Sequence, residues 1–341
     1  MAVTSQSMYW EDLTDEEILN LRVKDLGLRI KGSTLEPLID ALYAELEDRG
    51  VRFPPACYLA DEWLCPEGEP IIGIPFCLAH PRLKRIELRM MYEVEGDTEQ
   101  SCMKLLRHEC GHALNYAYRL HTRTRWRELF GSFSVPYSQT YDYQPYSRRF
   151  VVHLGDHYAQ AHPDEDFAET FAVWLDPGND WRHKYEHWPA IKKLNYVDTV
   201  MKKAGDTRPL VTSPGHPPWS ASRMTSTLHA YYNRKRKDLG SDFRGYYDDS
   251  LKNLFTDNPR VQSAEKASKL LRHYRRAIID DVARWTGHRK YDLHQLMDRF
   301  IARSDALRLY AEDDTQDAIS AAALLAAIAG GTHRPAARKH V

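Results

Sequence analysis

Residues His108-Glu109-Cys110-Gly111-His112 form an HExxH pattern. If this segment is helical, side chains four positions apart share one face, so both imidazoles can reach a single cation. Glu109 then lies beside the cation, where a general base for a metal-bound water is needed. The pattern predicts His108 and His112 as zinc ligands and Glu109 as the base. The alternative is that both histidines are ordinary hydrogen-bonded residues of a buried helix.

A zinc site with catalytic geometry needs a third protein ligand and leaves a fourth position for water. The segment HPDEDFAETFAVW, from His162 to Trp174, offers Glu165 and Glu169, which lie four residues apart. One of them can bind the metal while the other accepts a hydrogen bond from a ligand imidazole. The alternative is an acidic first turn favoured by the helix dipole. That alternative explains Glu165 adequately and Glu169 poorly, because the neighbours of Glu169 are apolar.

Together, HECGH and HPDEDFAETFAVWL resemble the motifs of a zinc-binding metallopeptidase family of the gluzincin type. The similarity runs from about residue 107 to residue 188 and includes WRELFG at 126–131. A more distant resemblance is to the catalytic lobe of the anthrax lethal factor. The resemblance implies that Glu165 is the third ligand and that Glu169 orients a ligand histidine. It also implies that Tyr158, seven residues before Glu165, donates its hydroxyl to the oxyanion of the reaction.

Other metal-ligating residue types are scattered along the chain. His153, His157 and His162 flank the second motif, and we expect them to be surface or capping residues. The five cysteines are Cys57, Cys65, Cys77, Cys102 and Cys110. They include no CxxC pair, which argues against a disulfide framework and against a thiolate zinc ribbon. Scattered cysteines fit a reducing compartment, and Cys110 is expected to pack rather than to bind metal.

Charge and hydropathy limit the classes of partner. The 341 residues carry 47 Lys and Arg against 48 Asp and Glu, so there is no global basic field to attract nucleic acid or anionic membranes. The N-terminal residues lack the apolar core of a secretory signal. The Ala-rich run 318–331 is shorter than the roughly 20 residues that a membrane-spanning helix needs. These features predict a cytoplasmic protein whose partner is a peptide or protein substrate.

Local patterns predict a mostly helical α+β fold, namely a gluzincin-like domain with a small sheet beside the HExxH helix. Thr14 and Glu17 have the spacing of a capping box, which predicts a helix start. The short apolar runs CYLADEWLC, IIGIPFCLAH and RIELRMMYEV, bounded by Pro and Gly, predict strands. The expected parts are a metallopeptidase domain (1–205), a linker (206–220) and a helical accessory region (221–341). The metallopeptidase domain is expected to comprise a helical N-terminal part (1–50), a small sheet (51–96) and the catalytic helices (98–204). Within the catalytic part, helices are expected at 98–120, 163–175 and 188–204, with a loop-rich insert at 121–150.

The predicted function is hydrolysis of peptide bonds with one zinc ion per chain. Two rivals stay open: a noncatalytic zinc-binding protein, and a zinc hydrolase acting on a non-peptide amide.

Basic clusters at Arg234–Lys237 and Arg272–Arg276 could touch phosphate or an acidic partner, although such runs are more often solvated helix faces. Sequence also leaves open whether the enzyme is latent, with the tyrosine-rich segment 137–146 blocking its cleft. Sequence does not decide between endo- and exopeptidase action, nor the oligomeric state.

Overall fold

A computed structural model describes residues 8–137, 141, 144, 146–155, 157–205, 207–212, 217–239, 248–258 and 265–332. The chain forms two compact units. Of the described residues, the first contains those up to Met90 and from Val94 to Tyr232, and the second contains Met91–Glu93 and those from Asn233 to Thr332. Both candidate motifs lie in the first unit.

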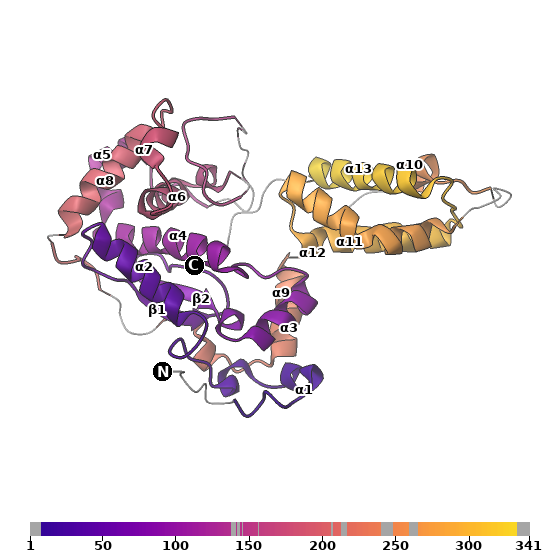
Figure 1. The fold of residues 1–341 in the computed structure, drawn as a ribbon, viewed down its shortest axis with the longest axis horizontal. Helices are drawn as coiled ribbons and strands as arrows, with labels where there is room; N and C mark the ends of the chain where they lie inside the picture. The colour runs from indigo at the N-terminus through magenta and orange to yellow at the C-terminus, as the bar shows by residue number, and fades with distance from the viewer. Residues whose placement is uncertain are drawn as a thin grey trace. The chain divides into compact units, whose positions relative to one another are not determined.

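The first unit is mainly helical (Figure 1). Its α-helices are α1 (Asp15–Leu19), α2 (Glu36–Asp48), α3 (Pro81–Met91), α4 (Glu99–Ala117), α5 (Thr124–Phe130), α6 (Pro163–Leu175), α7 (Trp181–Lys184), α8 (Ile191–Gly205) and the start of α9 (Leu228–Leu239). Short 3-10 helices are η1 (Val23–Leu26), η2 (Phe76–Ala79), η3 (Leu120–Thr122), η4 (Tyr158–Gln160) and η5 (Ala221–Arg223). The predicted capping box is confirmed, because the Thr14 and Glu17 side chains and backbones exchange hydrogen bonds at the start of α1.

The sheet has two parallel strands, β1 (Ala56–Ala60) and β2 (Ile71–Pro75), within the described residues. They pair in register from Ala56 opposite Ile71 to Ala60 opposite Pro75. The small sheet was therefore predicted correctly, but a third strand in RIELRMMYEV was not. The part of that run up to Met91 belongs to helix α3, since Leu83, Ile86 and Met91 are buried at helical spacing while Leu88 is 50% exposed.

Helix α4, which carries the HExxH residues, lies between α6 on one side and α2 and β2 on the other (Figure 1). A capping box of Thr98 and Ser101 starts it, and the residues from Leu105 to Ala117 are all buried. Its Arg107 forms a two-point ion pair with Glu45 of α2, at 2.8 and 2.7 Å. The guanidinium also lies 3.4 Å from Asp176, just after α6. This ion-pair network holds three elements together one residue before His108.

Gly111 sets the distance between α4 and α6. A Cβ atom at this position would lie 2.9 Å from the Ala168 Cα and 3.1 Å from the Ala168 carbonyl oxygen. Those atoms belong to the α6 backbone and cannot move aside cheaply. Glycine within the HECGH motif therefore lets the two helices approach closely enough for side chains on both to meet.

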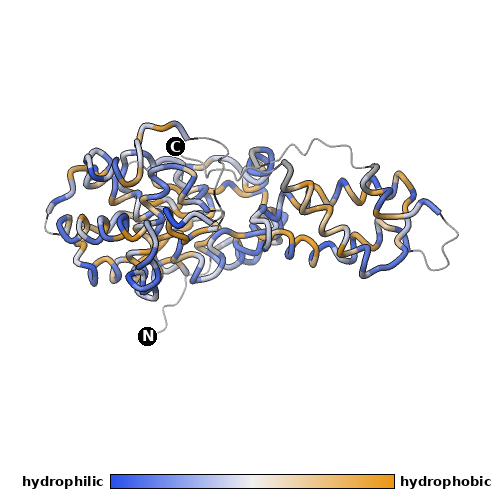
Figure 2. Tube along the Cα trace, turned by 90° about the horizontal axis from the view of Figure 1, so that it is seen from above, coloured by the Kyte–Doolittle hydropathy of each residue, from blue (hydrophilic) through white to orange (hydrophobic). Residues whose placement is uncertain are grey.

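The second unit contains the end of α9, α10 (Asp248–Leu254), α11 (Ala267–Thr286), α12 (Lys290–Ala306) and α13 (Asp314–Thr332). Apolar residues recur along α11, α12 and α13 (Figure 2) and form one buried cluster. Leu271, Ile279, Leu296, Phe300 and Leu325 are among its fully or nearly fully buried members. This bundle confirms the helical prediction for the C-terminal region.

The Arg272–Arg276 cluster in α11 is balanced by carboxylates. Arg272 contacts Asp305 at 2.7 Å and Arg275 contacts Asp298 at 2.6 Å. Because aspartates of α12 face these arginines, the cluster is an ion-paired helix surface rather than an open cationic patch.

The boundary between the two units does not coincide with the expected linker at 206–220. Residues beyond that segment still pack in the first unit: Leu228 N donates to the Leu21 carbonyl, and the Tyr231 hydroxyl donates to the Asp61 carbonyl. Sequence patterns also did not predict the short helices α5, α7 and α10. Among the described residues, no helix has the length and apolar character to cross a membrane.

Candidate metal centre

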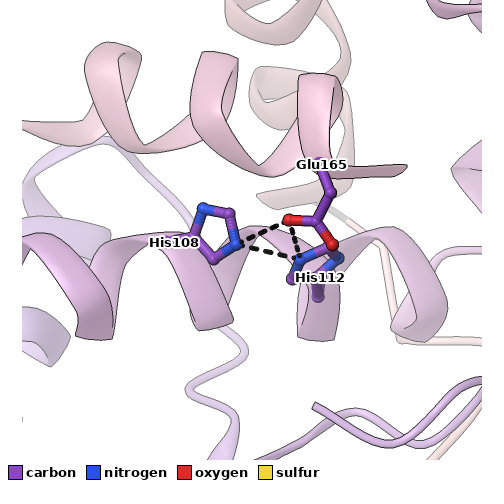
Figure 3. A group of neighbouring side chains, drawn as sticks. All are labelled: His108, His112 and Glu165. Carbon is purple, nitrogen blue, oxygen red and sulfur yellow. Dashed lines mark hydrogen bonds and ion pairs between the residues drawn. The ribbon is translucent and has the colours of Figure 1, made fainter. Parts of the chain in front are cut away.

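Three side chains of the two motifs converge between α4 and α6. His108 and His112 come from α4, and Glu165 comes from the first turn of α6, with all three pointing toward one another (Figure 3). The Nε2 atoms of the two imidazoles are 3.1 Å apart. Glu165 Oε2 lies 3.0 Å from His108 Nε2 and 3.3 Å from His112 Nε2. Their exposed fractions are 1%, 3% and 0%, so the cluster is buried and could hold a metal ion.

The donor set fits a zinc ion. Zinc bonds to imidazole nitrogen and carboxylate oxygen are about 2.0–2.2 Å long, so neighbouring corners of its tetrahedron lie roughly 3.3–3.5 Å apart. The three donor atoms are separated by 3.0, 3.1 and 3.3 Å. The edges of the observed triangle are therefore close to those of a coordination polyhedron. Three protein donors would leave one corner of a tetrahedron unfilled by the protein.

Each imidazole is oriented by a carboxylate on α6. His108 Nδ1 donates to Glu169 Oε1 at 2.9 Å, and His112 Nδ1 donates to Asp164 Oδ2 at 2.8 Å. The second oxygen of Glu169 accepts the backbone N–H of Leu154 at 2.9 Å. Carboxylates that accept the Nδ1 proton fix the ring orientation and the tautomer of a metal-binding histidine. The predicted partnership of Glu169 with a motif histidine is thus present in the structure.

The two Nδ1 hydrogen bonds show why positive charge would stabilise the cluster. With both Nδ1 atoms donating, each neutral imidazole has a lone pair on Nε2. Both lone pairs then face Glu165 Oε2, which is also an acceptor. Three acceptors packed within 3.0–3.3 Å of one another repel unless a proton or a metal ion lies between them.

Electrostatics agree with this picture. Burial lowers the pKa of His108, but the Glu165 and Glu169 carboxylates, which accept hydrogen bonds from the protonated ring, outweigh burial and raise the pKa overall. Burial likewise opposes the charged form of His112, yet the charges of Asp164 and Glu165 raise its pKa well above the ordinary value. Conversely, the pKa of Asp164 is lowered, because His112 and the Tyr116 hydroxyl outweigh burial. The surroundings therefore favour positive charge at the point where the three donors meet.

Glu109 is buried, with 4% of its surface exposed, and lies on α4 between the two histidines in sequence. Burial, followed by the charge of Glu109, raises the pKa of the Cys65 thiol well above its usual range. The Glu109 charge also contributes to the raised pKa of Tyr58 on β1, where burial is the main cause. The role of Glu109 as a general base stays a prediction.

Tyr158 is buried in η4, and the centre of its ring is 5.7 Å from that of His108. The residue before it, His157, has a left-handed backbone with φ of 54°. The Tyr158 ring thus lies beside one of the three converging side chains. Its part in oxyanion stabilisation stays a prediction.

The flanking histidines have other partners. His162 caps α6 by accepting the Asp164 backbone N–H at Nδ1, at 3.1 Å, as expected for a capping residue. The expectation of a surface or capping role was wrong for His153, which is buried and donates from Nε2 to the Lys104 carbonyl at 2.9 Å. Neither belongs to the ligand cluster. Cys110 is fully buried and a free thiol, which agrees with a packing role.

Sequence reasoning missed the network around Asp164, because an acidic residue in the first turn of a helix is already explained by the helix dipole. Its Oδ1 accepts from Asn115 Nδ2 at 2.6 Å, and its Oδ2 accepts from the Tyr116 hydroxyl at 2.6 Å in addition to His112. One signal was available. Asn115 and Tyr116 lie three and four positions after His112, so all three face α6 from the same side of α4.

Replacing Asp164 with asparagine is expected to weaken metal binding by about 10–100-fold, because the His112 ring loses the negative partner that orients it. Competition with a chelator of known affinity measures the change. Asp40→Asn, at an exposed position of α2, is the matched control and should bind metal as the wild type does. Equal affinity for Asp164→Asn and the wild type would contradict this role.

Comparisons with known proteins yielded no match: no family model, no curated protein and no solved structure matches the chain.

Proposed function

We propose that this chain is a zinc-dependent metallopeptidase of the gluzincin type, with one zinc ion held by His108, His112 and Glu165. The observation that carries the proposal is the convergence of three acceptor atoms, Nε2, Nε2 and Oε2, within 3.3 Å of one another in a buried site. The three donors come from two helices and are each oriented by a further contact. Two local sequence motifs thus supply a complete three-ligand set and its supporting carboxylates.

This set of three ligands fits a hydrolytic zinc site better than a purely structural one. Structural zinc is held by four protein ligands, usually with cysteine among them, whereas catalytic zinc is held by three and keeps one position for water. Among the described residues, the group found close enough to hold a metal is His108, His112 and Glu165. Bound zinc would lower the pKa of a coordinated water and polarise the scissile carbonyl.

The chain's own residues would then move protons and stabilise charge. Glu109, next to His108 in the motif, would accept a proton from the attacking water and pass it to the leaving amine. Tyr158, whose ring lies beside His108, would donate its hydroxyl to the developing oxyanion. Asp164 and Glu169 would hold the two imidazoles in the tautomer that leaves Nε2 for the metal.

A peptide library tests the proposal. Zinc-loaded protein is expected to cleave a subset of peptides, chelation should abolish cleavage, and added zinc should restore it. Mass spectrometry of the products identifies the bonds cut and separates endo- from exopeptidase action. If the zinc-loaded protein cleaves no peptide but hydrolyses small amides, the non-peptide alternative replaces this proposal. If the zinc-loaded protein hydrolyses neither peptides nor small amides, the noncatalytic alternative replaces this proposal.

A further inference from the structure

The two carboxylate oxygens of Glu165 have different surroundings. Oε2 faces the Nε2 atoms of His108 and His112, at 3.0 and 3.3 Å. Oε1 accepts a hydrogen bond from the Tyr137 hydroxyl, at 3.3 Å. Because Glu165 is fully buried, the tyrosine hydroxyl takes the place that water would fill at an exposed carboxylate.

Tyr137 is itself held in place by the start of α6. Its ring stacks on the His162 ring with centres 3.7 Å apart and planes 19° from parallel. His162 Nε2 donates to the Val135 carbonyl at 2.7 Å, and His162 Nδ1 accepts from the Asp164 backbone N–H. The hydroxyl that contacts Glu165 is therefore positioned by the residue that caps the same helix.

A second aromatic contact fixes the segment leading to Tyr137. Phe133 stacks on His121, with ring centres 4.3 Å apart and planes 27° from parallel. The His121 backbone N–H donates to Asn115 Oδ1 at 2.9 Å, and Asn115 in turn donates to Asp164. Phe133 and Val135 are thus attached to His121 and His162, and both histidines are linked to Asp164, the hydrogen-bond partner of His112.

We propose that Tyr137 is a positioning residue of the metal centre, which holds Glu165 so that Oε2 alone is presented to the metal. The proposal rests on the proposed zinc site. A carboxylate free to turn about its terminal bond can offer both oxygens to a cation, which would occupy the position that a catalytic site reserves for water. A hydrogen bond to Oε1 disfavours that rotation. Tyr137 would therefore control both the affinity of the site and its coordination number.

Tyr137→Phe in the full chain tests the proposal, because phenylalanine keeps the ring that stacks on His162 and removes only the hydroxyl. We expect zinc affinity, measured by chelator competition, to fall by about 10–100-fold. We also expect the visible absorption bands of bound Co²⁺, which report coordination number, to change in intensity and position. The melting temperature of the metal-free protein should stay close to that of the wild type.

Tyr196→Phe is the matched control. The hydroxyl of Tyr196 is also buried, and its ring packs against Phe130 rather than on His162. This variant should keep the wild-type zinc affinity and Co²⁺ spectrum. A Tyr137→Phe variant with unchanged zinc affinity and an unchanged Co²⁺ spectrum would overturn the positioning role while leaving the metal centre intact. A wild type that binds neither ion would overturn the metal centre itself, and this role with it.

Discussion

Replacing Glu109 with glutamine is expected to leave zinc binding intact and to lower the rate of peptide hydrolysis by about 10²–10⁴-fold, the usual contribution of general acid–base catalysis. Glutamine has nearly the same shape but cannot take a proton from water at neutral pH. Glu109 is not among the three converging donors, so the metal-ligand set is preserved. Peptide cleavage by the zinc-loaded variant, at matched metal content, measures the effect.

Glu128→Gln provides the control for this substitution. Glu128 lies on α5, is exposed and forms only a local ion pair with Arg125 among its described contacts. The Glu128→Gln variant should retain the wild-type rate of peptide hydrolysis. Full activity in Glu109→Gln would show that another group activates the water, while loss of zinc from that variant would show that Glu109 supports the ligands instead.

The second large effect is expected at Gly111. Alanine there would place its Cβ 2.9 Å from the Ala168 Cα, so α4 and α6 must move apart. We expect the free energy of unfolding to fall by about 1–3 kcal/mol, as for other overpacked cores. We also expect weaker zinc binding, because the ligands come from both helices. Urea denaturation and chelator competition measure the two effects.

Gly155→Ala makes the same chemical change at a position where a Cβ would meet nothing within 4 Å. It should leave both stability and zinc affinity close to the wild-type values. If Gly111→Ala behaved in the same way, the close approach of α4 and α6 would not be what brings the ligands together.

The sequence predicted those parts of the site that depend on local order. Helices α4 and α6 follow from signals within their own segments, namely an apolar stripe in α4 and Pro163 at the first turn of α6. Once both segments are helical, the spacing of four residues places His108 beside His112 on one face of α4. The same spacing places Glu169 one turn beyond Glu165 on α6.

Contacts between distant segments were harder to predict. Asp164 could be explained by the helix dipole alone, and only the packing of α6 on α4 shows that it accepts from His112 and Asn115. Tyr137 lies 28 residues from Glu165, in a segment with several other aromatic residues. No local spacing rule connects these positions, because their proximity depends on the contacts of His162 with the 133–137 segment.

Helix α3 shows how a short apolar pattern can be ambiguous. In RIELRMM, Ile86, Leu88 and Met90 alternate as they would in a strand. The structure instead buries Leu83, Ile86 and Met91, and the exposed position of Leu88 fits only the helical period. A run of this length cannot be assigned from periodicity alone, because tertiary packing decides which face is buried.

Metal content is the most direct test of the central claim that His108, His112 and Glu165 form one metal centre. Inductively coupled plasma mass spectrometry should find about one zinc ion per chain in the purified wild type, as a single three-ligand site implies. His112→Ala and Glu165→Ala should each lose the metal or bind it far more weakly. A wild type without zinc after exposure to the ion, together with variants of unchanged stability, would contradict the metal centre and the peptidase function built on it.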